Sequence, residues 1–345
     1  MAEKIISPGV FTNEIDQSFL PAAIADIGAV VIGPTVKGPA LTPTVVESYT
    51  DFQNKFGDSF KSGSNYLQFL TSHTAEQYLS QGGPLTVVRI LDGTYGPATA
   101  TIPTSSAGAG TSFKLTTLSD GTIMNNSSSI AQTNNILQSG SKHNIRWEVN
   151  GLNTTKGTFN LVIRRGDDIA KRKQVLETFN NISLDPNATN YIAKAIGDQK
   201  QTIRTDENGN PFLQLSGSYP NKSRFVIVSN MNDTVDYLDE NGEVRVPAAS
   251  SSLPWDTGSM SGQSGSFDGS FSGGADGFSG FDGLGNHNGT RTGVQPANFY
   301  EEISTNNSQG FDLGNSGEEG YSSYIEALDL LSNQDEYDIN LVLVP

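Results

Sequence analysis

The sequence predicts an α+β or α/β multidomain protein: a mixed-sheet α/β core domain with an inserted all-β domain and an extended N-terminal arm. Three observations predict this class. Apolar runs typical of buried strands flank a helical pattern early in the chain. Gly, Ser, Thr and Asn dominate residues 94–135, and only short β-like segments occur near them. Strand-like alternation also marks the first twenty residues, ahead of any strand that could anchor a core.

The extended arm covers residues 1–20. Pro8 fixes its own φ and biases Ser7 toward extended geometry, and alternation follows from Val10 to Ile15 with apolar residues on both faces. A terminal strand of this kind can add to the sheet edge of another subunit. It can equally pair with an edge of its own domain, and the arm alone leaves both alternatives open.

The core begins with the apolar run 27–32, which Gly33-Pro34 ends and which suits a strand buried on both faces. Apolar residues at helical spacing over 64–81 then predict a helix that ends at Gly82-Gly83-Pro84. A second buried strand is predicted at 85–91. Strand, helix and strand within about sixty residues are typical of a sheet with crossover connections.

The inserted domain is predicted from the change in composition after Gly93. Its strands are expected at 112–118, 144–149 and 158–164. The dipeptides Asp120-Gly121 and Asn150-Gly151 favour positive φ, as hairpin turns require.

The core is predicted to resume near Val175. Its remaining elements are expected to be a helix over 187–196, a strand over 224–229, a helix over 321–333 and a last buried strand over 339–344. Between the second and third of these, residues 248–320 are rich in Gly, Ser and Asp and are predicted to form a loop.

Composition sets further limits. The 345 residues, 35% of them hydrophobic, suffice for about two packed domains. A net charge of −16 repels phosphates, so neither nucleic acid nor a membrane surface is an expected partner. The absence of Cys excludes disulfides and thiolate chemistry. With no signal peptide and no apolar run of roughly 18 residues, the sequence predicts a soluble cytoplasmic protein.

No motif predicts catalysis, so we expect no enzyme activity, no catalytic or metal-binding residues and no cofactor. The segment 33–39 lacks the Gly-Lys-Ser/Thr of a phosphate loop, and His73, His143 and His287 lack the spacing of metal ligands. One imperfect Gly/Asp repeat near residue 275 is weak evidence for calcium. The only basic cluster combines 171–173 with Arg164 and Arg165; it indicates either a solvated hairpin or a contact with an acidic neighbouring subunit.

Several stretches, taken in order, resemble the tail sheath proteins of contractile-tailed bacteriophages (myoviruses). They cover most of residues 5–92 and 175–196 and the last dozen residues. The stretches are Ser7-Pro8-Gly9-Val10, Gly33 with Lys37-Gly38-Pro39, Asp51-Phe52 with Phe56-Gly57, Gly82-Gly83-Pro84 with Val87-Val88-Arg89, Glu177 to Pro186 with Asn190-Tyr191-Ile192, and Glu336 to Leu341.

This resemblance implies a division into an arm (1–20), a core (21–92 and 175–345) and an outward-facing insert (93–174). It also implies that the arm is exchanged between subunits as a strand. The arm residues expected to make that contact are Ser7, Pro8, Gly9, Val10, Phe11 and Ile15. Family members continue past the equivalent of Pro345 into a further domain and a C-terminal arm, so the chain is expected to be truncated at that end.

By resemblance, the chain is expected to be a structural subunit of stacked hexameric rings around the tail tube, contracting to drive the tube through the host envelope for genome delivery. Its partners would be other sheath subunits, the tail tube protein, and the baseplate and tail terminator proteins. Its location would be the virion tail, assembled in the host cytoplasm. Two alternatives remain: the sheath of a phage-derived injection machine or bacteriocin, and a tail-associated carbohydrate-binding or hydrolytic protein, which only the β-rich insert and the aromatic Gly/Ser loop favour.

Overall fold

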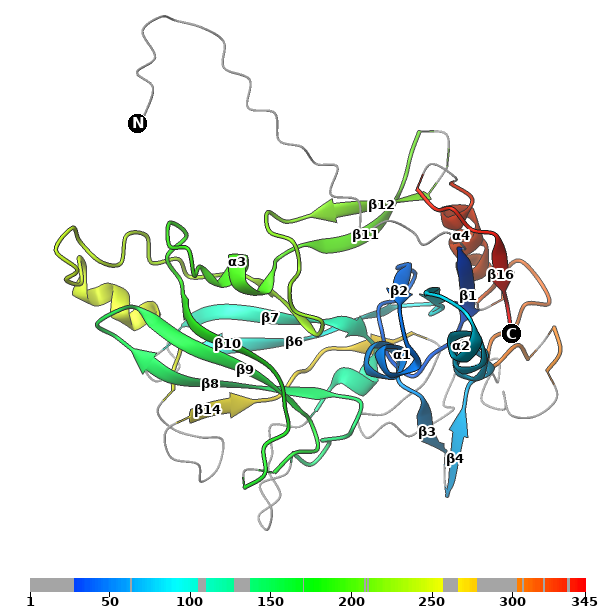
Figure 1. The fold of residues 1–345 in the computed structure, drawn as a ribbon, viewed down its shortest axis with the longest axis horizontal. Coiled ribbons are helices and arrows are strands. Elements are labelled where there is room, and N and C mark those ends of the chain that lie inside the picture. Colours follow the sequence, from blue (N-terminus) through cyan, green and yellow to red (C-terminus); the bar gives the residue numbers. More distant parts are fainter. Residues whose placement is uncertain are drawn as a thin grey trace, which may run out of the picture.

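The computed structural model describes residues 28–62, 64–104, 110–126, 137–169, 171–207, 209, 211–256, 266–277, 303–305, 307–318, 320–333 and 336–345. Within them, a four-stranded mixed sheet with helices on both faces adjoins a β-rich part made of two four-stranded antiparallel sheets (Figure 1). The predicted α+β multidomain class is therefore confirmed.

The mixed sheet has the strand order β16-β1-β5-β2. Strand β1 (Ala29–Gly33) runs parallel to both β5 (Leu85–Arg89) and β16 (Leu341–Leu343), and β2 (Thr44–Val46) is antiparallel to β5. All five residues of β1 are buried, as its continuous apolar run predicts. Helix α2 (Leu70–Gln81) lies on the crossover between β1 and β5.

Each face of this sheet has its own apolar cluster. On one face, Val31 and Val87 pack with Phe52 of α1 (Tyr49–Phe56) and with Ala75 of α2. On the other, Val30, Ile32 and Val88 pack with Tyr324 and Ala327 of α4 (Tyr321–Leu331). Alternate residues of one strand therefore hold helices from distant parts of the sequence.

The helix predicted over 64–81 begins six residues later than expected. Residues 65–68 form β4 (Asn65–Gln68), which pairs antiparallel with β3 (Ser59–Ser62). Tyr66, one of the apolar residues within that predicted helix, is 73% exposed on this hairpin. The four-residue ladder and the packing of Phe60 on Phe69, with ring centroids 4.9 Å apart, outweigh the local helical spacing.

The β-rich part consists of two antiparallel four-stranded sheets. One has the order β10-β9-β8-β14, with β8 (Ile145–Asn153), β9 (Thr158–Arg165), β10 (Val175–Ser183) and β14 (Ser266–Gly269). The other has the order β13-β7-β6-β15, with β6 (Tyr95–Pro103), β7 (Thr111–Asp120), β13 (Val226–Ser229) and β15 (Ala275–Asp276). Their inner faces share one core, in which Phe113 of β7 stacks on Phe159 of β9 with ring centroids 5.6 Å apart.

Strand pairing crosses the predicted boundary at residue 174. Strands β10, β13, β14 and β15 all follow that residue, yet each pairs with a strand that precedes it. The predicted loop over 248–320 accordingly contains β14 and β15 and a 3₁₀ turn at Pro247–Ser252. A change in composition cannot reveal this, because ladder partners are chosen by hydrogen bonds between distant segments.

The smaller elements also differ from expectation. Helix α3 (Ile192–Ile196) is shorter than predicted, and Lys200–Thr205 (β11) forms a separate hairpin with Pro211–Ser216 (β12). A 3₁₀ turn (Thr122–Met124) follows Gly121. Gly121 and Gly151 do have positive φ, as predicted. Gly151, however, lies in a register shift of β8 rather than at a hairpin turn.

The prediction that the last strand is buried is wrong. Leu341 and Val342 of β16 are 42% and 47% exposed, whereas a buried strand was predicted. Among the described strands, β16 pairs only with β1 and so forms the edge of the sheet. An edge strand leaves apolar side chains accessible whatever its sequence suggests.

Gly38 gives a test of this packing. Its φ is +116°, and a Cβ there would lie 2.5 Å from a ring carbon of Phe56. We expect Gly38→Ala to lower the free energy of unfolding by about 2–3 kcal/mol, because it strains the backbone and displaces α1. Urea unfolding followed by tryptophan fluorescence measures this loss.

The matched control is Gly83→Ala, where a Cβ meets no atom within 4 Å. This variant should stay within about 0.5 kcal/mol of the wild type. Equal losses in the two variants would contradict the packing described for Gly38.

Candidate functional site

The predicted arm residues Ser7, Pro8, Gly9, Val10, Phe11 and Ile15 lie outside the described residues, so their role stays a prediction. The other stretches from the first hundred residues that carry the sheath resemblance are described. Residues from these stretches, far apart in sequence, meet around the end of β5: Gly33, Lys37-Gly38, Phe56 and Arg89.

Arg89, the last residue of β5, is the centre of this meeting point. Its side chain is fully buried, and Nη1 donates to the carbonyl of Gly38 at 2.7 Å and to that of Asp120 at 2.8 Å. Asp120 in turn donates its backbone N–H to Gly38 and accepts the N–H of Ala40 through Oδ2. One guanidinium thus joins the connection after β1 to the end of β7, and so joins the mixed sheet to the β-rich part.

Two neighbouring contacts place Phe56 and Gly33 at the same joint. The N–H of Lys37 donates to the carbonyl of Phe56 at the end of α1, at 3.0 Å. On the other side, a Cβ at Gly33 would lie 2.3 Å from Oγ1 of Thr71, so only glycine lets α2 approach β1 this closely. Gly33, Lys37 and Phe56 therefore contribute to the packing around the joint where the mixed sheet meets the β-rich part.

No carboxylate among the described residues forms a hydrogen bond or ion pair with the guanidinium of Arg89. Burial lowers the pKa of its guanidinium, and the nearby carboxylates of Asp276 and Asp120 oppose that shift. Its Nε and Nη2 have no hydrogen-bond partner among the described residues. Arginine stays protonated even so, and its cation is held here mainly by carbonyl dipoles.

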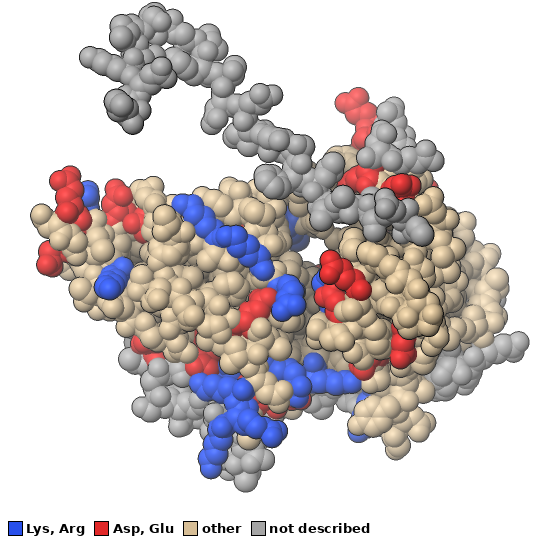
Figure 2. Space-filling view, in the orientation of Figure 1, with Lys and Arg blue, Asp and Glu red and all other residues tan. Residues whose placement is uncertain are grey.

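A cleft of about 550 Å³ lies beside this joint. Its walls come from the connection between β1 and β2, the end of α1, β7, the start of β11 and the segment before β13. Figure 2 shows the molecule hollowed between its two parts, with basic side chains beside the opening. The cations that line the cleft are Lys37, Lys55, Lys200 and Arg224, and the acids are Asp120 and Glu326.

Two titratable groups are buried in the wall of this cleft. Lys37 is 9% exposed, and burial lowers the pKa of its ammonium to about 8. His143 is 4% exposed, and burial, together with the charges of Lys37 and Lys142, lowers its pKa to about 3. His143 is therefore neutral at neutral pH, whereas the sequence indicated only that it lacks the spacing of a metal ligand.

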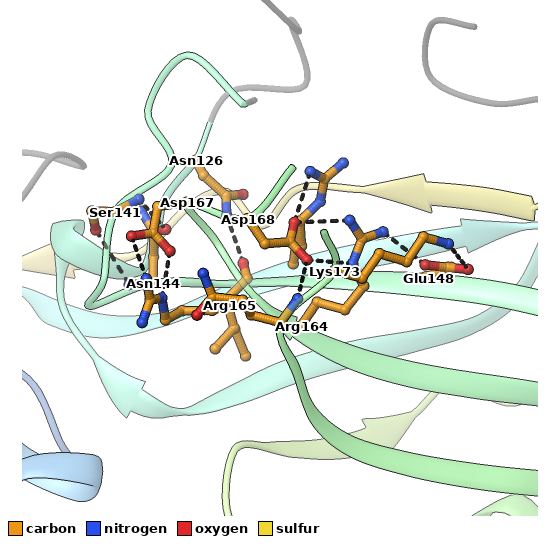
Figure 3. A network of polar contacts seen from close by, with 12 residues as sticks. Asn126, Ser141, Asn144, Glu148, Arg164, Arg165, Asp167, Asp168 and Lys173 are labelled. Atoms are coloured by element: carbon orange, nitrogen blue, oxygen red, sulfur yellow. Dashed lines mark hydrogen bonds and ion pairs between the residues drawn. The ribbon is translucent and has the colours of Figure 1, made fainter. Parts of the chain in front are cut away.

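The predicted basic cluster is divided by the fold (Figure 3). Arg164 is fully buried and binds both carboxylate oxygens of Asp168, at 2.7 and 2.8 Å, while its Nη1 donates to Glu148 at 2.7 Å. Lys173 also reaches Glu148, at 2.8 Å, and Arg165 pairs with Asp167 near the surface. For Arg164, both sequence alternatives are wrong. Arg164 lies on the face of β9 opposite the core residues Leu161 and Ile163, where it is buried with its carboxylate partners, whereas Arg165 ends the strand and is partly exposed.

This network of ion pairs offsets the repulsion between two arginines that face each other on β8 and β9. Arg146 and Arg164 lie directly opposite each other in the ladder, and both side chains are buried. Like charges in that position repel. The carboxylate of Asp168 binds both, since Arg146 Nη1 also donates to its Oδ1 at 3.3 Å. Asp168 therefore makes this register possible.

We expect Asp168→Asn to lower the free energy of unfolding by about 3–5 kcal/mol, because it leaves two buried cations without their shared anion. The matched control is the adjacent Asp167→Asn, which removes a partly exposed pair and should cost less than about 1 kcal/mol. Urea unfolding of both variants measures the difference. Similar losses would contradict the central role of Asp168.

The buried His143 predicts a pH dependence. The pKa of its imidazole is near 6.5 in the unfolded chain and about 3 in the folded protein, so its contribution to stability is complete above pH 6.5 and is lost as the pH falls toward 3. The wild type should lose about 2 kcal/mol more than His143→Gln between pH 7 and pH 5. His73→Gln, at an exposed position, should retain the wild-type dependence. Identical slopes for wild type and His143→Gln would contradict burial of the neutral ring.

Two further findings concern the described part of the chain only. No group of three or more His, Cys, Asp or Glu side chains there could hold a metal ion. None of its helices is long and apolar enough to cross a bilayer.

No protein-family model and no curated protein matches the chain. Among solved structures, it is similar to a sheath tail protein from Listeria innocua, with 12% identity and a TM-score of 0.31 over 72% of this chain and 34% of that one. It is also similar to a sheath tail protein from Desulfitobacterium hafniense, with 11% identity and a TM-score of 0.34 over 97% of this chain and 45% of that one. The chain thus spans about a third and just under half of the length of these two proteins.

Proposed function

We propose that the protein is a structural subunit of a contractile bacteriophage tail sheath. In this proposal it polymerises with six-fold helical symmetry as stacked hexameric rings around a tail tube, and contraction drives the tube through the host envelope for genome delivery. Its partners are other copies of itself, the tail tube protein, and the baseplate and tail terminator proteins. It is assembled in the host cytoplasm and ends in the virion.

The observation that carries this proposal is the meeting of the sheath-like stretches at Arg89. Gly33, Lys37-Gly38, Phe56 and Arg89 are separated by up to 56 positions, yet they contact one another directly or through one intermediate residue. Stretches that resembled the family only by chance would have no reason to meet at a single joint. These early stretches lie in one folded unit, the mixed sheet with α1 and α2, whereas the stretch 177–192 begins within β10 in the β-rich part.

The same joint suits a subunit that moves as a rigid body. A buried guanidinium bonded to Gly38 and Asp120 ties the mixed sheet to the β-rich part, so bending there would expose unpaired carbonyls at a cost of about 1–3 kcal/mol each. Residues 93–174 are proposed to face outward. The arm, with Ser7, Pro8, Gly9, Val10, Phe11 and Ile15, is proposed to add as a strand to a neighbouring subunit.

Electron microscopy of tailed particles with a gold-labelled antibody against residues 93–161 tests the function. Label that repeats at regular intervals along the tail is the expected result. Label confined to the tail tip, or absent from particles, would assign the protein to the baseplate or to an adhesin and overturn the proposal. Regular label on particles without DNA would place the sheath in an injection machine or bacteriocin.

Deletion of residues 1–20 tests the arm. We expect the full-length protein to lose polymerisation, because each subunit would lack the strand that tethers it to the next, while the monomer stays folded. Sedimentation measures assembly, and circular dichroism checks the fold. Asn13→Ser, which keeps the alternation of the arm, is the control and should assemble normally. Tubes at normal yield from the deletion variant would show that the arm is not the tether.

A further inference from the structure

We propose that the cleft beside Lys37 binds a carboxylate from the acidic loop 236–243 of a second copy of this chain. The proposal rests on the proposed function, because a sheath is built from repeated copies of one subunit. It adds a specific contact: an acidic loop at one end of a subunit inserts into a basic cleft of the next.

Lys37 provides the first argument. Lys37 lines the cleft and is 9% exposed, and its ammonium has no hydrogen bond or ion pair with the described residues. The carboxylate that acts on it electrostatically, Asp58, already accepts a hydrogen bond from Lys142 at 3.1 Å. A buried cation without a bonded anion is costly, which is why its pKa falls to about 8. An incoming carboxylate would remove that cost.

The rest of the cleft favours the same ligand. Four cations and two acids line it in a chain of net charge −16, and one of the cations, Arg224, already pairs with Glu177 at 3.7 Å. Lys55 already pairs with Asp51, and Asp120 accepts from Ala40. Lys200 has no side-chain hydrogen bond or ion pair among the described residues, although it acts electrostatically on Asp120, and it is exposed at the rim. Aliphatic stems and backbone complete the walls, so a carboxylate on a short polypeptide loop fits better than a highly charged ion.

The acidic loop provides the second argument. Residues 236–243 contain Asp236, Asp239, Glu240 and Glu243 and no Lys or Arg. Oδ1 of Asp239 accepts the N–H groups of Asn241 and Glu243, at 2.8 and 2.9 Å, which fixes the turn. Glu240 and Glu243 are exposed at its tip. The loop is thus organised before binding, which reduces the entropy lost on docking.

Geometry makes the contact intermolecular. The loop follows β13 and lies at the end of the β-rich part, at the left in Figure 1, whereas the cleft is lined by residues of α1 and β2 on the other side of that part. The loop therefore cannot reach the cleft of its own molecule. A contact between two different surfaces repeats from copy to copy and produces an open helical array.

A synthetic peptide of residues 234–246 with a fluorescent label, titrated with the full chain, tests the proposal by anisotropy. We expect salt-sensitive binding that weakens about tenfold or more in Lys37→Met, because the peptide carboxylate loses its buried partner. Lys200→Gln, at an exposed site, should weaken binding a few-fold. Lys61→Gln, exposed on the β3–β4 hairpin away from the cleft, should leave binding unchanged. A peptide carrying Glu240→Gln and Glu243→Gln should not bind.

Three results would overturn the proposal: no binding of the wild-type peptide, binding that Lys37→Met and Lys200→Gln leave unchanged, or displacement of the peptide by glutarate at equal concentration, which would indicate a site for small acids. Circular dichroism checks that Lys37→Met is folded, and the exposed Lys200 gives an independent reading if it is not. Regular gold label along tails together with an inert peptide would overturn this contact and leave the sheath function standing.

Discussion

The arrangement of the described structure depends on the buried guanidinium of Arg89. It donates from β5 to Gly38, after β1, and to Asp120, at the end of β7, and so fixes the two parts of the molecule relative to each other. A buried cation must find acceptors, and here backbone carbonyls supply them. Loss of this side chain would leave the carbonyl of Gly38 with only the N–H of Asp120 and would free one wall of the cleft.

The β-rich part shows a second use of buried charge. Arg146 and Arg164 face each other across β8 and β9. Two apolar residues in these positions would not repel each other, whereas two arginines do. Asp168 and Glu148 compensate both charges, so the strands are stable in this register because all these groups are present together. A register slip by one residue would separate the cations from the carboxylates as well as turning the apolar side chains outward. The network therefore contributes to specificity of pairing more than to net stability.

The two parts place different binding groups at different ends of the molecule. The mixed sheet ends at β16, an edge strand whose backbone is unpaired by any described strand, and the cleft lies where this sheet meets the β-rich part. The exposed acids of loop 236–243 lie at the far end. A subunit with unlike surfaces at its ends can join its copies in a continuing series, which a subunit with one self-complementary surface cannot do.

The sequence by itself determined the elements whose signals are local. The apolar runs of β1 and β5, the amphipathic spacing of α4 and the positive φ of Gly121 and Gly151 were all predictable, because they follow from the conformational preferences of neighbouring residues. Only the tertiary structure decided that β10, β13, β14 and β15 complete sheets begun before residue 174, that β16 is an edge, and that Arg164 is buried. It also brought Lys37 and His143 to one cleft. These outcomes depend on hydrogen bonds, burial and electrostatic contacts between segments far apart in the chain, which no local pattern records.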